Sequence, residues 1–251
     1  MTDTKDNTLT ETKDKRGKFF QHPRIQRLLG GGTIELWGIG LLSRVQMTVM
    51  RAHKIPADMT LLRRIRLRRG TLLTADENYN ILSFARGYAH REGSFIEIGT
   101  YRGASAKLFC EAKGDKKFYV CDTFEGLPQD GPKDQPVHRS NQYACSLESV
   151  SEYLKEYPNI TYVKGFFPQS AEGVIPEDEK FSFAHIDVDQ YDGTIQGLEY
   201  LYPKMIPGGA IISHDFSILE GVRQAVHEFM EKHPEASLVE LPTTQCLIIK
   251  P

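Results

Sequence analysis

This chain of 251 residues contains few cysteines, and its formal net charge is close to zero. Four cysteines are present, and they form no CxxC pair and do not have the spacing of a small disulfide-linked domain: Cys110, Cys121, Cys145 and Cys246. Reduced thiols and a cytoplasmic location are therefore expected. The formal net charge of −2 gives no bulk attraction to nucleic acid, so no nucleic-acid partner is expected.

Long apolar runs are also missing. Residues 1–18 are polar and lack the apolar segment of a signal peptide, which predicts a disordered tail. The longest apolar stretch, residues 33–50, contains Glu35 and Arg44 and falls short of the roughly 20 residues that a membrane-spanning helix requires. No integral membrane span is expected.

Positive charge is concentrated in residues 51–69, which hold seven Lys or Arg and one acidic residue. With its leucines and isoleucine, such a segment can lie on an anionic membrane surface as a peripheral contact, or hold a phosphorylated substrate. A solvated basic face or an interface between the subunits of a homo-oligomer is the simpler interpretation, and the sequence alone favours it.

From residue 94 onward, short apolar runs alternate with segments of helical periodicity, and two further apolar runs close the chain around a Pro-Thr-Thr turn. This pattern predicts a doubly wound α/β fold, with a mostly parallel sheet, helices on both faces and a C-terminal antiparallel hairpin. Residues 91–251 would form this domain. Residues 19–90 are a helical extension expected to cover the sheet edge that binds ligands, or to contact another subunit.

Ligands of such sheets bind at the carboxyl ends of the strands, and the first of these ends has the sequence EIGTYRGASA. Gly99 and Gly103 permit a close approach of the backbone to a ligand, but their spacing is not that of a dinucleotide-binding GxGxxG loop. Asp122 ends the next strand, where a carboxylate can accept hydrogen bonds from ribose hydroxyls. A tight turn and a local cap are the alternatives, and the two loops together favour a nucleoside ligand.

Acidic residues and a histidine follow the next two strands, in the sequences HIDVDQYDGT and ISHDF. Adjacent parallel strands lie about 5 Å apart, so Asp187, His214 and Asp215 are expected to converge beside the nucleoside pocket. Convergence of these donors predicts a divalent metal site. The alternative is local: the two aspartates cap helices and His214 is a buried imidazole with satisfied hydrogen bonds.

These motifs together resemble the macrocin O-methyltransferase family, and the resemblance extends from about residue 70 to residue 233. The motifs that carry it are EIGTYRGASA, CDTFEGLP, ACSLESV, VKGFFPQSA, HIDVDQYDGT and YPKMIPGGAIISHDF. The family implies a class I, seven-stranded Rossmann-like fold. It also implies S-adenosylmethionine as cofactor and methylation of a sugar or phenol hydroxyl on a small natural product.

The resemblance further implies roles for individual residues. The cofactor would be held by Glu97, Gly99, Thr100, Tyr101, Gly103 and Ser105 at its methionine end, by Asp122 at its ribose, and by Thr123, Phe124, Gly165 and Phe167 around its adenosine. Asp187, His214 and Asp215 would bind the metal, and Asp187 would also take the proton of the acceptor hydroxyl. Family members more often have Asp-Asp where this chain has His214-Asp215. Imidazole suits Mn better than Mg, so the identity of the metal stays open.

Two other functions fit parts of the sequence. Asp187 and Asp189 resemble the Asp-x-Asp motif of metal-dependent glycosyltransferases, although that motif leaves the Gly99 loop and Asp122 unexplained. A non-catalytic scaffold on a membrane surface would account for the basic segment alone.

Overall fold

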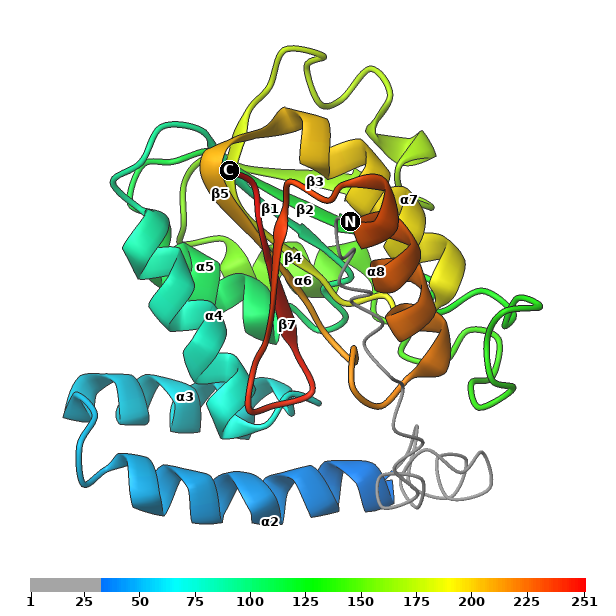
Figure 1. Ribbon diagram of the computed structural model, residues 1–251. Helices are drawn as coiled ribbons and strands as arrows, with labels where there is room; N and C mark the ends of the chain where they lie inside the picture. Colours follow the sequence, from blue (N-terminus) through cyan, green and yellow to red (C-terminus); the bar gives the residue numbers. More distant parts are fainter. Residues whose placement is uncertain (1–32) are drawn as a thin grey trace, which may run out of the picture.

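The computed structural model describes residues 33–251 (Figure 1). The expected disordered tail, residues 1–18, and the first part of the expected extension, residues 19–32, lie outside the described residues.

One sheet of seven strands forms the centre of the molecule, in the order β3-β2-β1-β4-β5-β7-β6. The first five strands in this order pair in parallel, whereas β7 pairs antiparallel with both β5 and β6. The predicted doubly wound sheet and its C-terminal hairpin are thus confirmed. The strands are β1 Ser94–Ile98, β2 Phe118–Asp122, β3 Ile160–Lys164, β4 Phe181–Ile186, β5 Met205–Ser213, β6 Ser237–Glu240 and β7 Cys246–Ile249.

The central strands β1 and β4 are buried on both faces, which explains why their sequences are almost continuously apolar. Side chains of alternating residues enter two separate cores. Phe95 and Phe183 face the first core, with α4 and α5, whereas Ile96 and Ile186 face the second, with α7 and α8.

The helices connecting these strands begin at recognisable signals. Thr74 caps α4 in a capping box with Glu77, and Ser146 caps α6, as the sequence predicted for that helix. The helices are α2 Thr33–Met50, α3 Pro56–Arg69, α4 Ala75–Tyr88, α5 Ala104–Lys113, α6 Leu147–Leu154, α7 Tyr191–Leu201 and α8 Glu220–Lys232, with 3-10 turns η1 Gln169–Ala171 and η2 Tyr202–Lys204.

The N-terminal helices α2 and α4 contribute side chains to the cavity at the sheet edge where the site lies. In α4, Ile81, Leu82 and Ala85 are fully buried and share the core of the first sheet face. In Figure 1, α2 and α3 lie at the outer edge of the molecule, below α4. Among the described residues, no helix combines the length and apolarity that crossing a membrane demands.

The loop after β1 passes unusually close to the end of β4. Gly99 has φ +85°, and a Cβ placed there would lie 1.8 Å from the carbonyl oxygen of Asp187. The same loop is fixed by hydrogen bonds from Gly99 N to the Cys121 carbonyl (2.8 Å) and from Asp187 N to the Ile98 carbonyl (2.8 Å). Glycine is therefore required for the β1 and β4 ends to meet.

Replacing this glycine tests the close approach. We expect Gly99→Ala to lower the free energy of unfolding by about 2–4 kcal/mol, because strain from the positive φ adds to a backbone clash. Gly173→Ala is the control, since Gly173 also has a positive φ (+71°) but a Cβ there meets no atom within 4 Å. Urea unfolding of both variants separates the two effects. Equal losses for both variants would show that crowding against β4 contributes nothing.

Candidate active site

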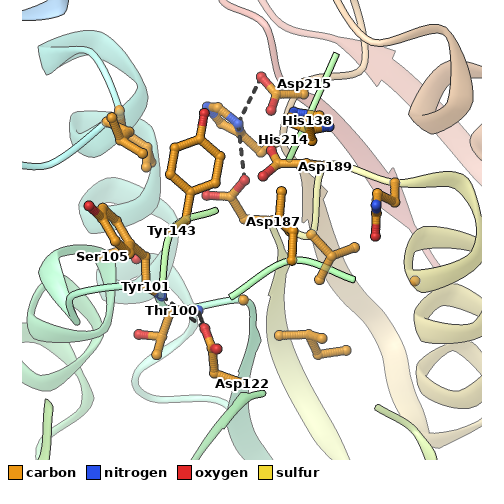
Figure 2. Close-up of a pocket in the computed structure, with 18 of the residues that line it drawn as sticks. Thr100, Tyr101, Ser105, Asp122, His138, Tyr143, Asp187, Asp189, His214 and Asp215 are labelled. Carbon is orange, nitrogen blue, oxygen red and sulfur yellow. Dashed lines mark hydrogen bonds and ion pairs between the residues drawn. The ribbon is translucent and has the colours of Figure 1, made fainter. Parts of the chain in front are cut away.

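A cavity of about 480 Å³ lies at the carboxyl ends of β1, β2, β4 and β5. Its walls come from the loops that follow these strands, from the long loop 126–143, and from α2 and the start of α4. Figure 2 shows that Asp122 and Thr100 lie at one end of this cavity and that Asp187, His214 and Asp215 gather at the other. The strand-end loops singled out from the sequence therefore do converge on one site.

Most of the predicted cofactor residues line this cavity, but three do not. The lining residues among them are Gly99, Thr100, Tyr101, Ser105, Asp122, Thr123, Gly165 and Phe167. Gly103 instead forms the N-cap of α5 and packs against Val150, and Phe124 is buried in the core of the first sheet face. The structure does not bring Glu97 to the cavity either.

Glu97 lies inside β1, where its side chain points into the first core. Its Oε1 is 3.0 Å from Nδ1 of His185 on the adjacent strand β4, and both side chains are fully buried. The family resemblance placed Glu97 at the methionine end of the cofactor. It missed His185, which the register pairs directly with Glu97.

Asp122 serves as an anchor for the β1 loop. Its Oδ2 accepts hydrogen bonds from the backbone N–H groups of Thr100 (2.8 Å) and Tyr101 (2.9 Å), and its Oδ1 accepts one from Phe124 (2.7 Å). Burial raises the pKa of this carboxyl group, and the three N–H donors partly offset that effect. The carboxylate thus fixes the shape of the β1 loop from the end of β2.

Asp187, His214 and Asp215 form one compact cluster. Each offers a potential metal-binding atom, and these atoms all lie within 4.8 Å of one another. His214 Nδ1 is 3.2 Å from Asp187 Oδ1 and 3.0 Å from Asp215 Oδ1. Burial opposes the charge of the imidazole, but the surrounding carboxylates raise the pKa of His214 well above its ordinary value. Burial would likewise raise the pKa of Asp187, yet the charge on His214 holds it below its ordinary value.

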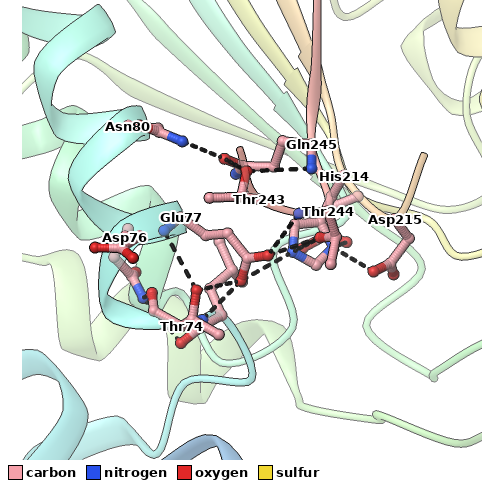
Figure 3. A network of polar contacts seen from close by, with 12 residues as sticks. Thr74, Asp76, Glu77, Asn80, His214, Asp215, Thr243, Thr244 and Gln245 are labelled. Carbon is pink, nitrogen blue, oxygen red and sulfur yellow. Dashed lines mark hydrogen bonds and ion pairs between the residues drawn. The ribbon is translucent and has the colours of Figure 1, made fainter. Parts of the chain in front are cut away.

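Glu77 completes this cluster from the N-terminal helix α4, and sequence reasoning did not find it (Figure 3). Its Oε2 lies 3.5 Å from His214 Nε2, and its Oε1 accepts a 2.7 Å hydrogen bond from the Thr244 hydroxyl. Burial alone would raise the pKa of Glu77, but His214, Thr244 and Thr74 together hold it well below its ordinary range. The T-x-x-E sequence of the capping box was visible at residues 74–77, but nothing local connects it with His214.

Asp189 also lines the cavity, beside the cluster. It is held at φ +59°, and burial together with the nearby Asp215 and Asp187 raises its pKa well above the ordinary value. A raised pKa for one carboxyl group is the arrangement expected when several carboxyl groups share one site.

The remaining wall of the cavity is largely apolar. It includes Ile39, Leu42, Leu127, Val137, Ile218 and Leu219. In the long loop, His138 lines the cavity and its Nδ1 lies 3.3 Å from Asp130 Oδ1, whereas the adjacent Arg139 is exposed and does not line the cavity. This wall can accommodate an acceptor with an apolar part.

The fold is the Rossmann-like fold of solved O-methyltransferases. The solved O-methyltransferase NovP has this fold, with a TM-score of 0.64 and 24% sequence identity over 72% of this chain and 81% of its own. An O-methyltransferase from Bacillus cereus, solved in complex with SAH, aligns with a TM-score of 0.58 at 13% identity, over 85% of this chain and all of its own.

The chain belongs to the macrocin O-methyltransferase (TylF) family, whose family model matches residues 88–242. A curated relative is the 8-demethyl-8-(2,3-dimethoxy-alpha-L-rhamnosyl)-tetracenomycin-C 4'-O-methyltransferase of Streptomyces olivaceus, 28% identical over 56% of this chain. The chain spans 59% of that enzyme's length. The resemblance seen in the sequence motifs is thereby confirmed, and the glycosyltransferase alternative is not supported.

The anchor formed by Asp122 can be tested by a nearly isosteric change. We expect Asp122→Asn to lower the free energy of unfolding by about 1–3 kcal/mol, because the amide leaves at least one buried N–H group of the β1 loop without an acceptor. Chemical unfolding measures the loss, and Asp178→Asn, at an exposed carboxylate, provides the control. Unchanged stability of Asp122→Asn would mean that its three hydrogen bonds do not fix the loop.

Proposed function

We propose that this protein is an S-adenosylmethionine-dependent, divalent-metal-dependent O-methyltransferase that acts on a hydroxyl of a sugar-bearing or phenolic small molecule. One observation supports this most strongly. The anchored β1 loop with Asp122 and the cluster of Asp187, His214 and Asp215 face the same cavity. Membership of the family supports methyl transfer to a hydroxyl, and the rhamnosyl group in the name of the Streptomyces olivaceus relative supports a sugar-bearing acceptor.

The β1 loop has the features that a bound adenosylmethionine needs. Gly99 and Tyr101 adopt positive φ, which folds the loop tightly over the strand ends. Thr100 lines the cavity, and its buried hydroxyl has no hydrogen-bond partner among the described residues, so it can serve the polar end of the cofactor. The cofactor supplies a methyl group already activated by a sulfonium. The protein's part is to orient the acceptor oxygen in line with that methyl group.

The cluster has the donors of a divalent metal site. His214 Nδ1 lies between Asp187 and Asp215 but makes no hydrogen bond of good geometry within the described part of the chain. Glu77 faces the other ring nitrogen, as carboxylates commonly do behind a metal-binding histidine. Two carboxylates and one imidazole suit Mn²⁺ at least as well as Mg²⁺. A cation held there would lower the pKa of an acceptor hydroxyl.

Asp187 takes the proton of the acceptor hydroxyl in this proposal. It lines the cavity at the end of β4, and its low pKa keeps it ionised near neutral pH, so a lone pair is available. A bound cation, or a proton on His214 in its absence, would balance the charge of the surrounding carboxylates. A homo-oligomeric state and a cytoplasmic location stay predictions. A non-catalytic scaffold would show no turnover, which the following measurement decides.

Methyl transfer, its dependence on a metal and the role of Asp187 as base can be tested together by screening glycosides and catechols with adenosylmethionine. We expect mass spectrometry to detect a product heavier by one methyl group, chelator to abolish its formation, and added Mg²⁺ or Mn²⁺ to restore it. Asp187→Asn should reduce turnover by at least about a hundredfold, which is the low end for loss of a general base. Its cofactor affinity by calorimetry should stay near that of the wild type.

Asp178→Asn is the matched control and should retain full turnover. Undiminished turnover in chelator together with an active Asp187→Asn variant would contradict the metal-and-base assignment. It would leave Asp187 as a structural partner of His214, since the N-cap of α7 is Gln190.

The metal site itself can be probed by two substitutions. Glu77→Gln keeps a residue that can complete the capping box, so α4 should remain folded, but it removes the charge behind His214. We expect metal affinity, measured by calorimetry, to fall about 10- to 100-fold. His214→Asp should shift the preference from Mn²⁺ toward Mg²⁺, because it gives an all-oxygen donor set. Unaltered metal affinity in Glu77→Gln would show that Glu77 acts only on the helix.

A further inference from the structure

The two N-terminal helices leave apolar side chains exposed on the outer edge of the molecule. We call the surface that they form, together with the exposed basic residues of the same helices, the α2–α3 face. Trp37 is 70% exposed, Val49 62% and Leu67 74%. Among the side chains that the structure describes in these helices, the large apolar ones that are exposed are Trp37, Leu41, Leu42, Val45, Val49, Ile55 and Leu67.

On α2 these side chains form a continuous stripe. Trp37, Leu41, Val45 and Val49 recur every four residues, so they share one side of the helix. The buried side chains Ser43, Met47 and Met50 occupy the opposite side. The helix is therefore apolar on two sides, and helices apolar all round are normally covered on all sides.

The exposed charged side chains that the described parts of α2 and α3 contribute to this face are all basic, and one of them, Arg64, pairs with Glu111 of α5 at 3.4 Å. The exposed basic side chains include Arg44, Arg51, Arg63, Arg64 and Arg68. Residues 36–69 contain a single acidic residue, Asp58, which is 1% exposed and paired with Arg86 through two contacts of 2.7 Å. An apolar stripe with arginines and without acids is complementary to an anionic lipid surface.

We propose that the α2–α3 face docks onto a bilayer containing anionic lipid. The sequence alone favoured a solvated face or a subunit interface for residues 51–69. The apolar stripe on the neighbouring helix changes that assignment, because a solvated face does not need it. A symmetric contact with a second copy would bring two arginine-bearing faces together, whereas anionic headgroups neutralise them.

Docking would place the cavity next to the bilayer. Gly38, Ile39 and Leu42 of α2 also line the cavity, and Leu42 belongs to the exposed set as well. An acceptor with an apolar part would then enter from the lipid side. This consequence rests on the proposed function, whereas docking itself does not.

Trp37 is the only tryptophan in the chain, so its fluorescence reports on the face directly. The full chain is mixed with phosphatidylcholine vesicles that contain or lack phosphatidylserine. We expect a blue shift of the emission and quenching by brominated lipid only with phosphatidylserine, together with co-sedimentation that weakens as salt is raised. Absence of both the blue shift and co-sedimentation with anionic vesicles overturns the proposal.

Variants divide the effect into its charged and apolar parts. Neutralising Arg44, Arg51, Arg63 and Arg68 to Gln should weaken vesicle binding at least about tenfold. The control variant undergoes the same change of charge outside this face: the exposed Lys117, Lys155, Lys164 and Lys232 are replaced by Gln. Its affinity for the vesicles should stay close to that of the wild type. Leu41→Ser with Val45→Ser should weaken binding while the circular dichroism spectrum stays unchanged.

Other occupants of the face give different results. Emission that is already blue-shifted without vesicles, and that reverts on dilution, identifies a second copy and overturns the proposal. Blue-shifted emission that is independent of both dilution and vesicles identifies residues 1–32 as the cover and also overturns it. Methyl transfer to a water-soluble acceptor, measured separately without vesicles, tests the proposed function independently of docking.

Discussion

The arrangement of the site depends on one buried imidazole surrounded by carboxylates. His214 contacts Asp187 and Asp215 through one ring nitrogen and Glu77 through the other. These residues come from β4, from the end of β5 and from α4, so a single side chain joins the sheet edge to the N-terminal helices. A cluster of carboxylates buried without a cation would be strongly unfavourable. The positive charge, whether of a proton or of a metal, is what permits the cluster to exist.

The sequence predicted those features of the site that follow from strand topology. Asp187, His214 and Asp215 could be placed together because adjacent parallel strands bring their carboxyl ends to one edge. Glu97 was assigned by the family resemblance and not by this reasoning, and it lies within β1 and not beyond its end. The side chain therefore enters the core and pairs with His185. Position along a strand, and not only distance from a glycine loop, decides which residues reach a ligand.

Glu77 and Thr244 could not be found from sequence for a different reason. Their contact joins residues 167 positions apart, and it depends on how α4 packs against the turn between β6 and β7. No local pattern encodes such packing. The parts of the fold fixed by periodicity, namely the alternating strands and helices and the closing hairpin, were predictable. The exposed stripe on α2 was not, because an apolar sequence of that length is usually buried.

Glu77 has two partners at once, and this links the site to the folding of a helix. The carboxylate that accepts hydrogen bonds from Thr74 to close the first turn of α4 also faces His214. Thermodynamic linkage is reciprocal, so any ligand that alters the charge on His214 must also alter the stability of that turn. Amide hydrogen exchange at the start of α4 would then record occupancy of the cavity, although the first turn of α4 lies far from His214 in the sequence. The stability of the first turn of α4 therefore depends on whether a ligand occupies the site.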